Sequence, residues 1–495
     1  MAFMQPLHLF DGRGLSIERI AELAESAGRV DLSAESWQRI AAARVIVERR
    51  LAEGSAIYGV NTGIGSQKDV GVCAERLADF SNRMIVSEAT DFPGPLASEQ
   101  AVRAALVVLI NNIAGGLTGV RPDLARRLLE LYAAPRMPAV RRDTSFGTAD
   151  LTPLSQLSLA VLGRSLDGEP PILPARMDLA AKESVSLINS NSFALGSGAL
   201  VLTRALRLLG ACDLAAACAL EGLRGGLRAH AAQAAGGFRG EGQERSRSNL
   251  LGALMGSGLH RPDQARFLQD PLSFRSITQI NGAAYEVWSW AKRQFEAEIN
   301  SCVDNPLVDL ELGELFTSSS MVSLLPALSM DALRQALAKA AVQSMERGLK
   351  LQSPPFSGLP VGLSEEGAAD GGILSINLNY IGAARMGSLM AAAAPVVLQY
   401  VGHTADGVED VTSLMPLSVS QTDVVVDRAW EIVALEMAIA VWAMARRRLS
   451  LGEVGEGPRR VYAALLPLLH IGAEGRRIFD MKKIIALVRD GDLVR

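Results

Sequence analysis

The stretch LGSGALVLTRALRLLGACDLAAACALEGLRGGLRAH, residues 195–230, decides the fold class of this sequence. Alanine and leucine dominate it, and both lose little side-chain freedom in a helix. Apolar residues recur at helical spacing and surround most of the helix, which is typical of a helix packed on several sides. Residues 330–352 and 425–449 repeat the pattern. We therefore predict an all-α protein whose long helices pack inside a bundle.

Composition and charge narrow the class of protein further. The chain has 495 residues, of which 49% are hydrophobic, so it can bury a large core. Its 49 Lys and Arg against 53 Asp and Glu leave a net charge of −4, which favours neither nucleic acid nor a membrane surface. Charged residues at 204, 207 and 213 interrupt the apolar stretch near 195–220, which therefore falls short of a transmembrane span. We expect a soluble protein without nucleic-acid or membrane partners.

Cysteine and histidine usage argues against a metal site. The four cysteines lack CxxC spacing, and the five histidines show neither HxxH nor HExxH spacing. The N-terminus lacks the features of an export signal. These observations predict a cytoplasmic protein with no metal. Breaker residues predict loops at 57–66, 141–153, 234–248 and 353–372.

Seven short motifs occur in a fixed order along the chain. They are YGVNTGIG at 58–65, INNIAGGLTGVR at 110–121, KESVSLINSNS at 182–192, QDPLSFRS at 269–276, VDNPLV at 303–308, SPPF at 353–356 and VEDVTS at 408–413. In this order they resemble the aromatic amino acid ammonia-lyase and 2,3-aminomutase family, which includes histidine and phenylalanine ammonia-lyases.

The resemblance implies an architecture and an assembly. It implies a smaller N-terminal mixed domain with active-site loops at 1–190, followed by a central and C-terminal helical bundle at 191–495. It also implies a homotetramer whose active sites combine residues from several subunits. The partner of such a site is a small-molecule amino acid or related carboxylate.

The stretch TSFGTADLTPL at 144–154 departs from the family pattern. Family members carry an Ala-Ser-Gly triad here, which cyclises and dehydrates to methylidene-imidazolone (MIO), the electrophile of the reaction. Both flanks align, but this sequence is one residue shorter, with Thr148-Ala149 in the space of the triad. We therefore predict that MIO is absent and that there is no other cofactor. The alternative is a shifted triad, Gly147-Thr148-Ala149, which the Cβ of Ala149 and the extra methyl of Thr148 oppose.

Four residues match functional positions of the family. Tyr58 matches the proposed base that removes the β-proton, and Asn189 matches the residue that hydrogen-bonds the MIO or the substrate amine. Arg275 matches the arginine that pairs with the substrate carboxylate, and Glu409 the glutamate near the amine. Their alternatives are structural: a buried tyrosine, a helix-capping asparagine, an ion-paired arginine and a solvated or paired carboxylate.

Three further positions differ from the family's usual residues. Leu272 replaces a tyrosine, and Met321 falls, on a loose alignment, in a segment that usually reads Gly-Gly-Asn-Phe-His. Glu88 stands at the selectivity position, where a buried carboxylate needs a cation, a polar substrate group or a proton. Glu88 is therefore a candidate acid or base, its alternative being a structural pair with Arg83 or Arg103.

Three hypotheses of function follow. The first is a divergent ammonia-lyase-like enzyme that acts without MIO by elimination, addition, isomerisation or condensation. The second is a non-catalytic ligand-binding or partner subunit. The third is a conventional ammonia-lyase or aminomutase with the shifted prosthetic group.

Overall fold

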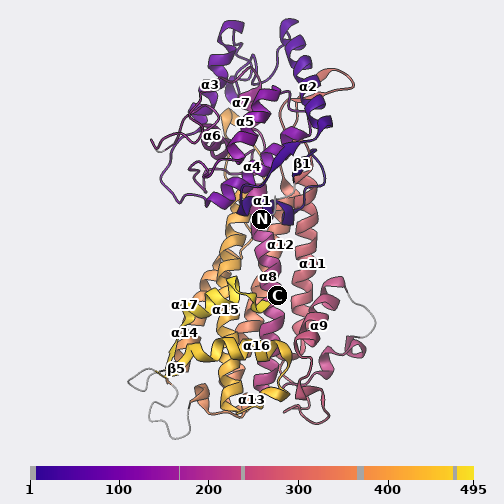
Figure 1. The fold of residues 1–495 in the computed structure, drawn as a ribbon, viewed down its shortest axis with the longest axis vertical. Helices are drawn as coiled ribbons and strands as arrows, with labels where there is room; N and C mark the ends of the chain where they lie inside the picture. Colours follow the sequence, from indigo (N-terminus) through magenta and orange to yellow (C-terminus); the bar gives the residue numbers. More distant parts are fainter. Residues whose placement is uncertain (1–6, 167, 236–239, 365–372, 472–476, 495) are drawn as a thin grey trace, which may run out of the picture. The chain divides into compact units, whose positions relative to one another are not determined.

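The computed structural model describes residues 7–494 apart from 167, 236–239, 365–372 and 472–476, and it divides into two compact units (Figure 1). Unit 1 comprises Met1–Thr203, Ala291–Met330 and Pro395–Ser420. Unit 2 comprises Arg204–Trp290, Asp331–Ala394 and Gln421–Arg495.

Unit 1 holds the helices α1 Ile17–Glu25, α2 Ala34–Ala52, α3 Leu77–Glu88, α4 Glu99–Ala114, α5 Pro122–Tyr132, α6 Leu151–Ser158 and α7 Glu183–Ile188, with the strands β1 His8–Phe10, β2 Val30–Leu32, β3 Leu307–Asp309 and β4 Glu314–Phe316. Unit 2 holds α9 Glu241–Ala253, α10 Leu272–Arg275, α13 Pro354–Ser357, α14 Ile373–Ala392, α16 Glu456–Leu465 and α17 Met481–Asp490, with β5 Leu469–Ile471 and β6 Arg477–Phe479. Four helices contribute residues to both units: α8 Ser192–Leu223, α11 Ile277–Ile299, α12 Leu324–Leu351 and α15 Met415–Arg446.

Unit 1 combines short helices with two small sheets. Its central element is α4, which is buried from Val102 to Ala114 and packs against α1 and α5. The helix begins where the Ser98 hydroxyl accepts a hydrogen bond from the Ala101 N–H at 3.1 Å, an N-cap that satisfies a free backbone donor. Strands β1 and β2 pair in parallel, and β3 and β4 pair in antiparallel register.

Unit 2 contains a bundle in which the long helices α8, α12 and α15 run side by side (Figure 1). A buried ion pair joins α12 to α15, with Arg347 Nη2 donating to Glu436 Oε2 at 2.8 Å. A Cβ built on Gly222 of α8 would lie 3.2 Å from the Ala443 methyl of α15, so small residues allow close approach. The three helices predicted from apolar periodicity are all present, which confirms the all-α fold class.

Some helices begin or end at other residues than the sequence predicts. Helix α8 stops at Leu223 because Arg224 adopts a left-handed backbone with φ of 62°. The loop predicted at 234–248 is wrong in its second half, where α9 begins at Glu241. The polar sequence of α9 suppressed the apolar signal, yet buried contacts and an Arg247–Glu244 ion pair support a helix there. The predicted loop at 353–372 lies partly outside the described residues.

The described part of the chain has neither a membrane-spanning helix nor a cluster of metal ligands. No helix in it has both the length and the apolar character needed to cross a membrane. Within the same residues, no group of three or more histidine, cysteine, aspartate or glutamate side chains is arranged to hold a metal ion. All four cysteines are free thiols. The division into domains at 1–190 and 191–495 stays a prediction.

Candidate active site

A cavity of about 580 Å³ lies within unit 1 and gathers most of the predicted site residues. Segments distant in sequence form its walls: the loop at 58–66, the end of α3, the loop at 144–152, the end of α7 and the segments 305–322 and 404–411. The predicted residues that line it are Tyr58, Glu88, Thr148, Ala149, Asn189, Met321 and Glu409. Such a volume is typical of small-molecule sites.

The Tyr58 loop presents a phenol to this cavity. The half-buried Tyr58 hydroxyl accepts a hydrogen bond from the Gly65 N–H at 3.1 Å. Gly65 has a φ of 54°, and a Cβ there would lie 2.9 Å from the Ala405 Cβ, so glycine is required both by conformation and by the close approach. This contact fixes the orientation of the phenol in the cavity.

Two carboxylates, Glu88 and Glu409, face the same cavity. Burial and, to a smaller extent, the negative charge of Glu409 raise the pKa of Glu88 above its usual value. Glu409 is held in place by Thr404, whose Oγ1 donates to its Oε2 at 2.9 Å. The structural pair considered for Glu88 does not form, because Arg83 pairs with Asp79 and Arg103 donates to the Tyr132 carbonyl at 2.7 Å.

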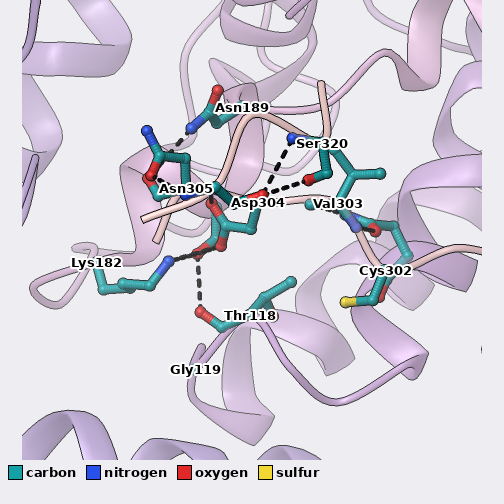
Figure 2. A network of polar contacts seen from close by, with 12 residues as sticks. Thr118, Gly119, Lys182, Asn189, Cys302, Val303, Asp304, Asn305 and Ser320 are labelled. Atoms are coloured by element: carbon teal, nitrogen blue, oxygen red, sulfur yellow. Dashed lines mark hydrogen bonds and ion pairs between the residues drawn. The ribbon is translucent and has the colours of Figure 1, made fainter. Parts of the chain in front are cut away.

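A buried polar network supports the Asn189 side of the cavity (Figure 2). Asn189 ends α7, and its Nδ2 donates to the Asn305 carbonyl at 3.1 Å. Next to Asn305, the carboxylate of Asp304 receives Lys182 Nζ at 2.6 Å and Ser186 Oγ at 2.7 Å. Lys182 and Asp304 are both 0% exposed, so this ion pair fixes the backbone that carries Asn305.

The loop at 144–150 contains the residues predicted to stand in place of the family's triad. Gly147 has a φ of 96°, and its carbonyl accepts from the Ser413 hydroxyl at 3.0 Å. Ala149 has a φ of 58° and is buried against Val303 and Met321. The Thr148 Oγ1 donates to the Val411 carbonyl at 3.3 Å. The Ser413 side chain and the Val411 backbone carbonyl thus hold the middle of the loop.

Asp150 closes this loop and is completely buried. Its Oδ2 accepts from the Ala194 N–H at 2.8 Å near the start of α8, and its Oδ1 accepts from the Ser145 hydroxyl at 2.8 Å. Burial raises the pKa of Asp150 to about 6, although these hydrogen bonds act in the opposite direction.

Leu272 and Arg275 belong to unit 2. Both lie on α10, where Leu272 is 63% exposed. When the Gln269 side-chain amide is oriented with its oxygen toward Arg275, that oxygen accepts hydrogen bonds from Arg275 Nη1 and Nη2, each at 2.9 Å. A guanidinium held by a neutral amide keeps its charge free for an anion.

Three residues at or behind the cavity were not predicted from the sequence. Asp410 and Asn305 line the cavity, and Asp304 forms the buried ion pair behind it. The signal was present in the VDNPLV and VEDVTS motifs, which contain all three. Spacing alone did not separate the residues that face the cavity from their neighbours.

Comparison with known proteins identifies the family of this chain. The family described as aromatic amino acid lyase matches residues 15–466, and the chain belongs to that family. Histidine ammonia-lyase from Stigmatella aurantiaca is 29% identical over 502 residues, covering 98% of this chain and 96% of the relative.

Solved structures share the fold. Ergothionase from Treponema denticola, an ergothioneine-degrading enzyme, superposes with a TM-score of 0.89 at 24% identity, covering 99% of this chain and 98% of its own. Tyrosine aminomutase from Streptomyces globisporus gives the same TM-score, identity and coverage. The chain is therefore an ammonia-lyase-like, helix-rich member of a family that contains enzymes.

Proposed function

We propose that this protein is a lyase-like enzyme that works without MIO on an amino acid or a related carboxylate, and that it expels a group that leaves more easily than ammonia. The observation that carries the proposal is the segment Thr148-Ala149, in which two residues stand in the space of the family's three. Loss of the electrophile removes the feature that activates an amine for departure.

The residues at 147–149 do not fit the self-formed ring. Ring closure needs the nitrogen of the third residue to reach the carbonyl of the first, and that third residue, Ala149, carries a buried methyl group at a left-handed φ. The Gly147 carbonyl already accepts from Ser413, and the Thr148 hydroxyl already donates to Val411. No step of the proposed reaction passes through MIO.

The charges of the cavity favour a cationic substrate group. Among the described lining residues, Glu88, Glu409 and Asp410 carry carboxylates, and none is lysine, arginine or histidine. A quaternary ammonium group fits this environment and leaves as a neutral amine without further activation. Ergothioneine, which the structurally similar ergothionase degrades, is itself a trimethylammonium betaine. This likeness supports the substrate class proposed.

The residues have distinct roles in such an elimination. Tyr58 removes the β-proton, and the hydrogen bond from the Gly65 N–H holds its hydroxyl in the cavity. Glu409 and Glu88 face the cationic nitrogen, and burial together with the charge of Glu409 raises the pKa of Glu88. Asn189 lines the cavity and is the proposed hydrogen-bond partner of the substrate. Arg275 does not line this cavity, so its role as the carboxylate ligand is proposed for the homotetramer, in which another subunit would supply it. A homotetramer and a cytoplasmic location remain part of the proposal.

Paired substrates test this proposal. Histidine, phenylalanine and tyrosine are each offered as the free amino acid and as the N,N,N-trimethyl betaine, and the released amine and unsaturated product are measured. We expect turnover of at least one betaine and no ammonia from its free amine, with Tyr58→Phe reducing the rate by about 100-fold or more. Ammonia release from a free amino acid at a comparable rate, or no turnover of any pair, would contradict the proposal.

One observation favours a second candidate, the conventional enzyme with a shifted ring. The backbone reverses so tightly that Gly147 and Ala149 form an isolated β-bridge, which brings their main chains together. This proximity is the starting point that cyclisation would need. The buried methyl of Ala149 opposes the reaction, and the mass measurement described below distinguishes the two candidates.

A further inference from the structure

A second cavity, of about 890 Å³, lies entirely within unit 2. One face of α8, one face of α9 and the first turns of α16 form its walls, and Tyr285 of α11 contributes its ring. The volume is within the range of cavities that bind small molecules. None of the residues assigned to the lyase reaction lines it.

Arginine side chains dominate the charge of this cavity. Four of them line it: Arg207, Arg245, Arg459 and Arg460. The carboxylates among the described lining residues are Glu456 and Asp213, so positive charge is in excess. Elsewhere in unit 2, Arg247 forms an ion pair with Glu244. We call this cavity, defined by the four arginines, the arginine cleft.

The carboxylate of Asp213 is already engaged by donors behind the cleft. It is 1% exposed and accepts hydrogen bonds from Ser246 at 2.6 Å, Asn281 at 2.8 Å, Asn249 at 3.0 Å and Tyr285 at 3.1 Å. Because these neutral donors use its lone pairs, Asp213 is not available to form a direct ion pair with the arginines.

The same network holds one guanidinium in a defined orientation. The Tyr285 hydroxyl donates to Asp213 and receives the Asn249 amide at 3.0 Å, which fixes its ring. The guanidinium carbon of Arg245 lies 4.9 Å from that ring's centroid and 6.0 Å from the Trp288 ring. A stacked guanidinium keeps its N–H edge available to bind an anion.

We propose that the arginine cleft binds a small multivalent oxyanion. Guanidinium groups match phosphate and carboxylate oxygens in bidentate geometry, and arginines on three helices can bind several oxygens of one molecule. Phosphorylated molecules and polycarboxylates share this chemistry. The proposal is independent of the lyase reaction because it uses different residues.

Calorimetric titration of the full chain tests this site with pyrophosphate and citrate as the two probes. We expect one binding site per chain for at least one probe, with affinity that falls as salt rises. The probe that binds more tightly identifies the ligand source as phosphorylated or carboxylic. Arg245→Ala and Arg459→Ala should each weaken binding by about tenfold or more.

The matched control is Arg247→Ala, which removes the same charge from the same helix but lies outside the cleft. It should leave the affinity unchanged. Arg459 is exposed, so its variant carries the test if Arg245→Ala fails to fold. Absence of binding by both probes, or an equal loss in Arg247→Ala and the cleft variants, would overturn the proposal.

Discussion

At the scale of single residues, Glu88 and Glu409 are coupled through the cavity that they share. The negative charge of Glu409 is the second cause, after burial, of the raised pKa of Glu88. Removing that charge in Glu409→Gln should therefore lower the pKa of Glu88. We predict that the Glu88 inflection in the pH dependence of kcat/KM moves to lower pH in Glu409→Gln and disappears in Glu88→Gln. An inflection that stays in place in Glu409→Gln would show that the two groups are not coupled.

The buried Lys182–Asp304 pair gives a second prediction at this scale. Asp304→Asn leaves the Lys182 ammonium buried without its counter-charge, which we expect to lower the free energy of unfolding by about 3–5 kcal/mol. Denaturant unfolding measures the loss. Asp79→Asn, which breaks the exposed pair with Arg83, is the control and should cost less than about 1 kcal/mol. Similar losses in both variants would refute a special role for the buried pair.

The residue-level site was predictable only in part. The motifs identified Tyr58, Glu88, Asn189 and Glu409 as candidates because each occupies a recognisable position in sequence, and the structure brings them to one cavity. Their catalytic roles stay predictions. The structural pairing considered for Glu88 could not be decided from sequence, since it depends on which arginine has another partner in three dimensions.

At the scale of elements, the loop at 144–150 depends on one glycine. A Cβ at Gly147 would lie 2.6 Å from Ser413 Oγ and 3.1 Å from the Leu414 nitrogen, and φ is 96°. We expect Gly147→Ala to lower the free energy of unfolding by about 1–3 kcal/mol. In Ala149→Gly, relief of the left-handed backbone offsets the lost methyl, so the change should stay below about 1 kcal/mol. Equal effects in urea unfolding would contradict this account.

Asp150 links this loop to the start of α8 and predicts a pH dependence. Its pKa is about 6 in the folded chain against 3.8 for the unperturbed group, so folding favours the protonated form. That stabilisation is complete below pH 3.8 and is lost as the pH rises through 6, by up to about 3 kcal/mol. The difference in free energy of unfolding between the wild type and Asp150→Asn should follow this curve. A difference that is constant from pH 4 to 7 would exclude it.

Helices with strong apolar periodicity were predictable, whereas polar helices and helix ends were not. The bundle helices α8, α12 and α15 follow directly from their alanine- and leucine-rich sequences. Helix α9 escaped prediction because its support comes from contacts with other helices, such as the Ser246 hydrogen bond to Asp213. Contacts of this kind have no local signal in the sequence.

At the scale of the whole molecule, the family fold is retained, and the predicted change lies in one functional loop. The match from residue 15 to residue 466 and the TM-score of 0.89 to solved structures show that the scaffold is intact. The differences on which the proposed function rests are the predicted shortening at Thr148-Ala149 and residues that line the cavity, such as Glu88. We propose that MIO does not form on this scaffold, which favours altered chemistry on a similar class of substrate.

The most direct test of the central claim is the mass of the peptide that spans residues 144–154, measured together with the intact chain. The account predicts the mass expected from the sequence, without loss of water. Formation of MIO removes two water molecules and would lower the mass by about 36 Da. A deficit of that size located at 147–149 would contradict the account and favour the conventional, shifted prosthetic group.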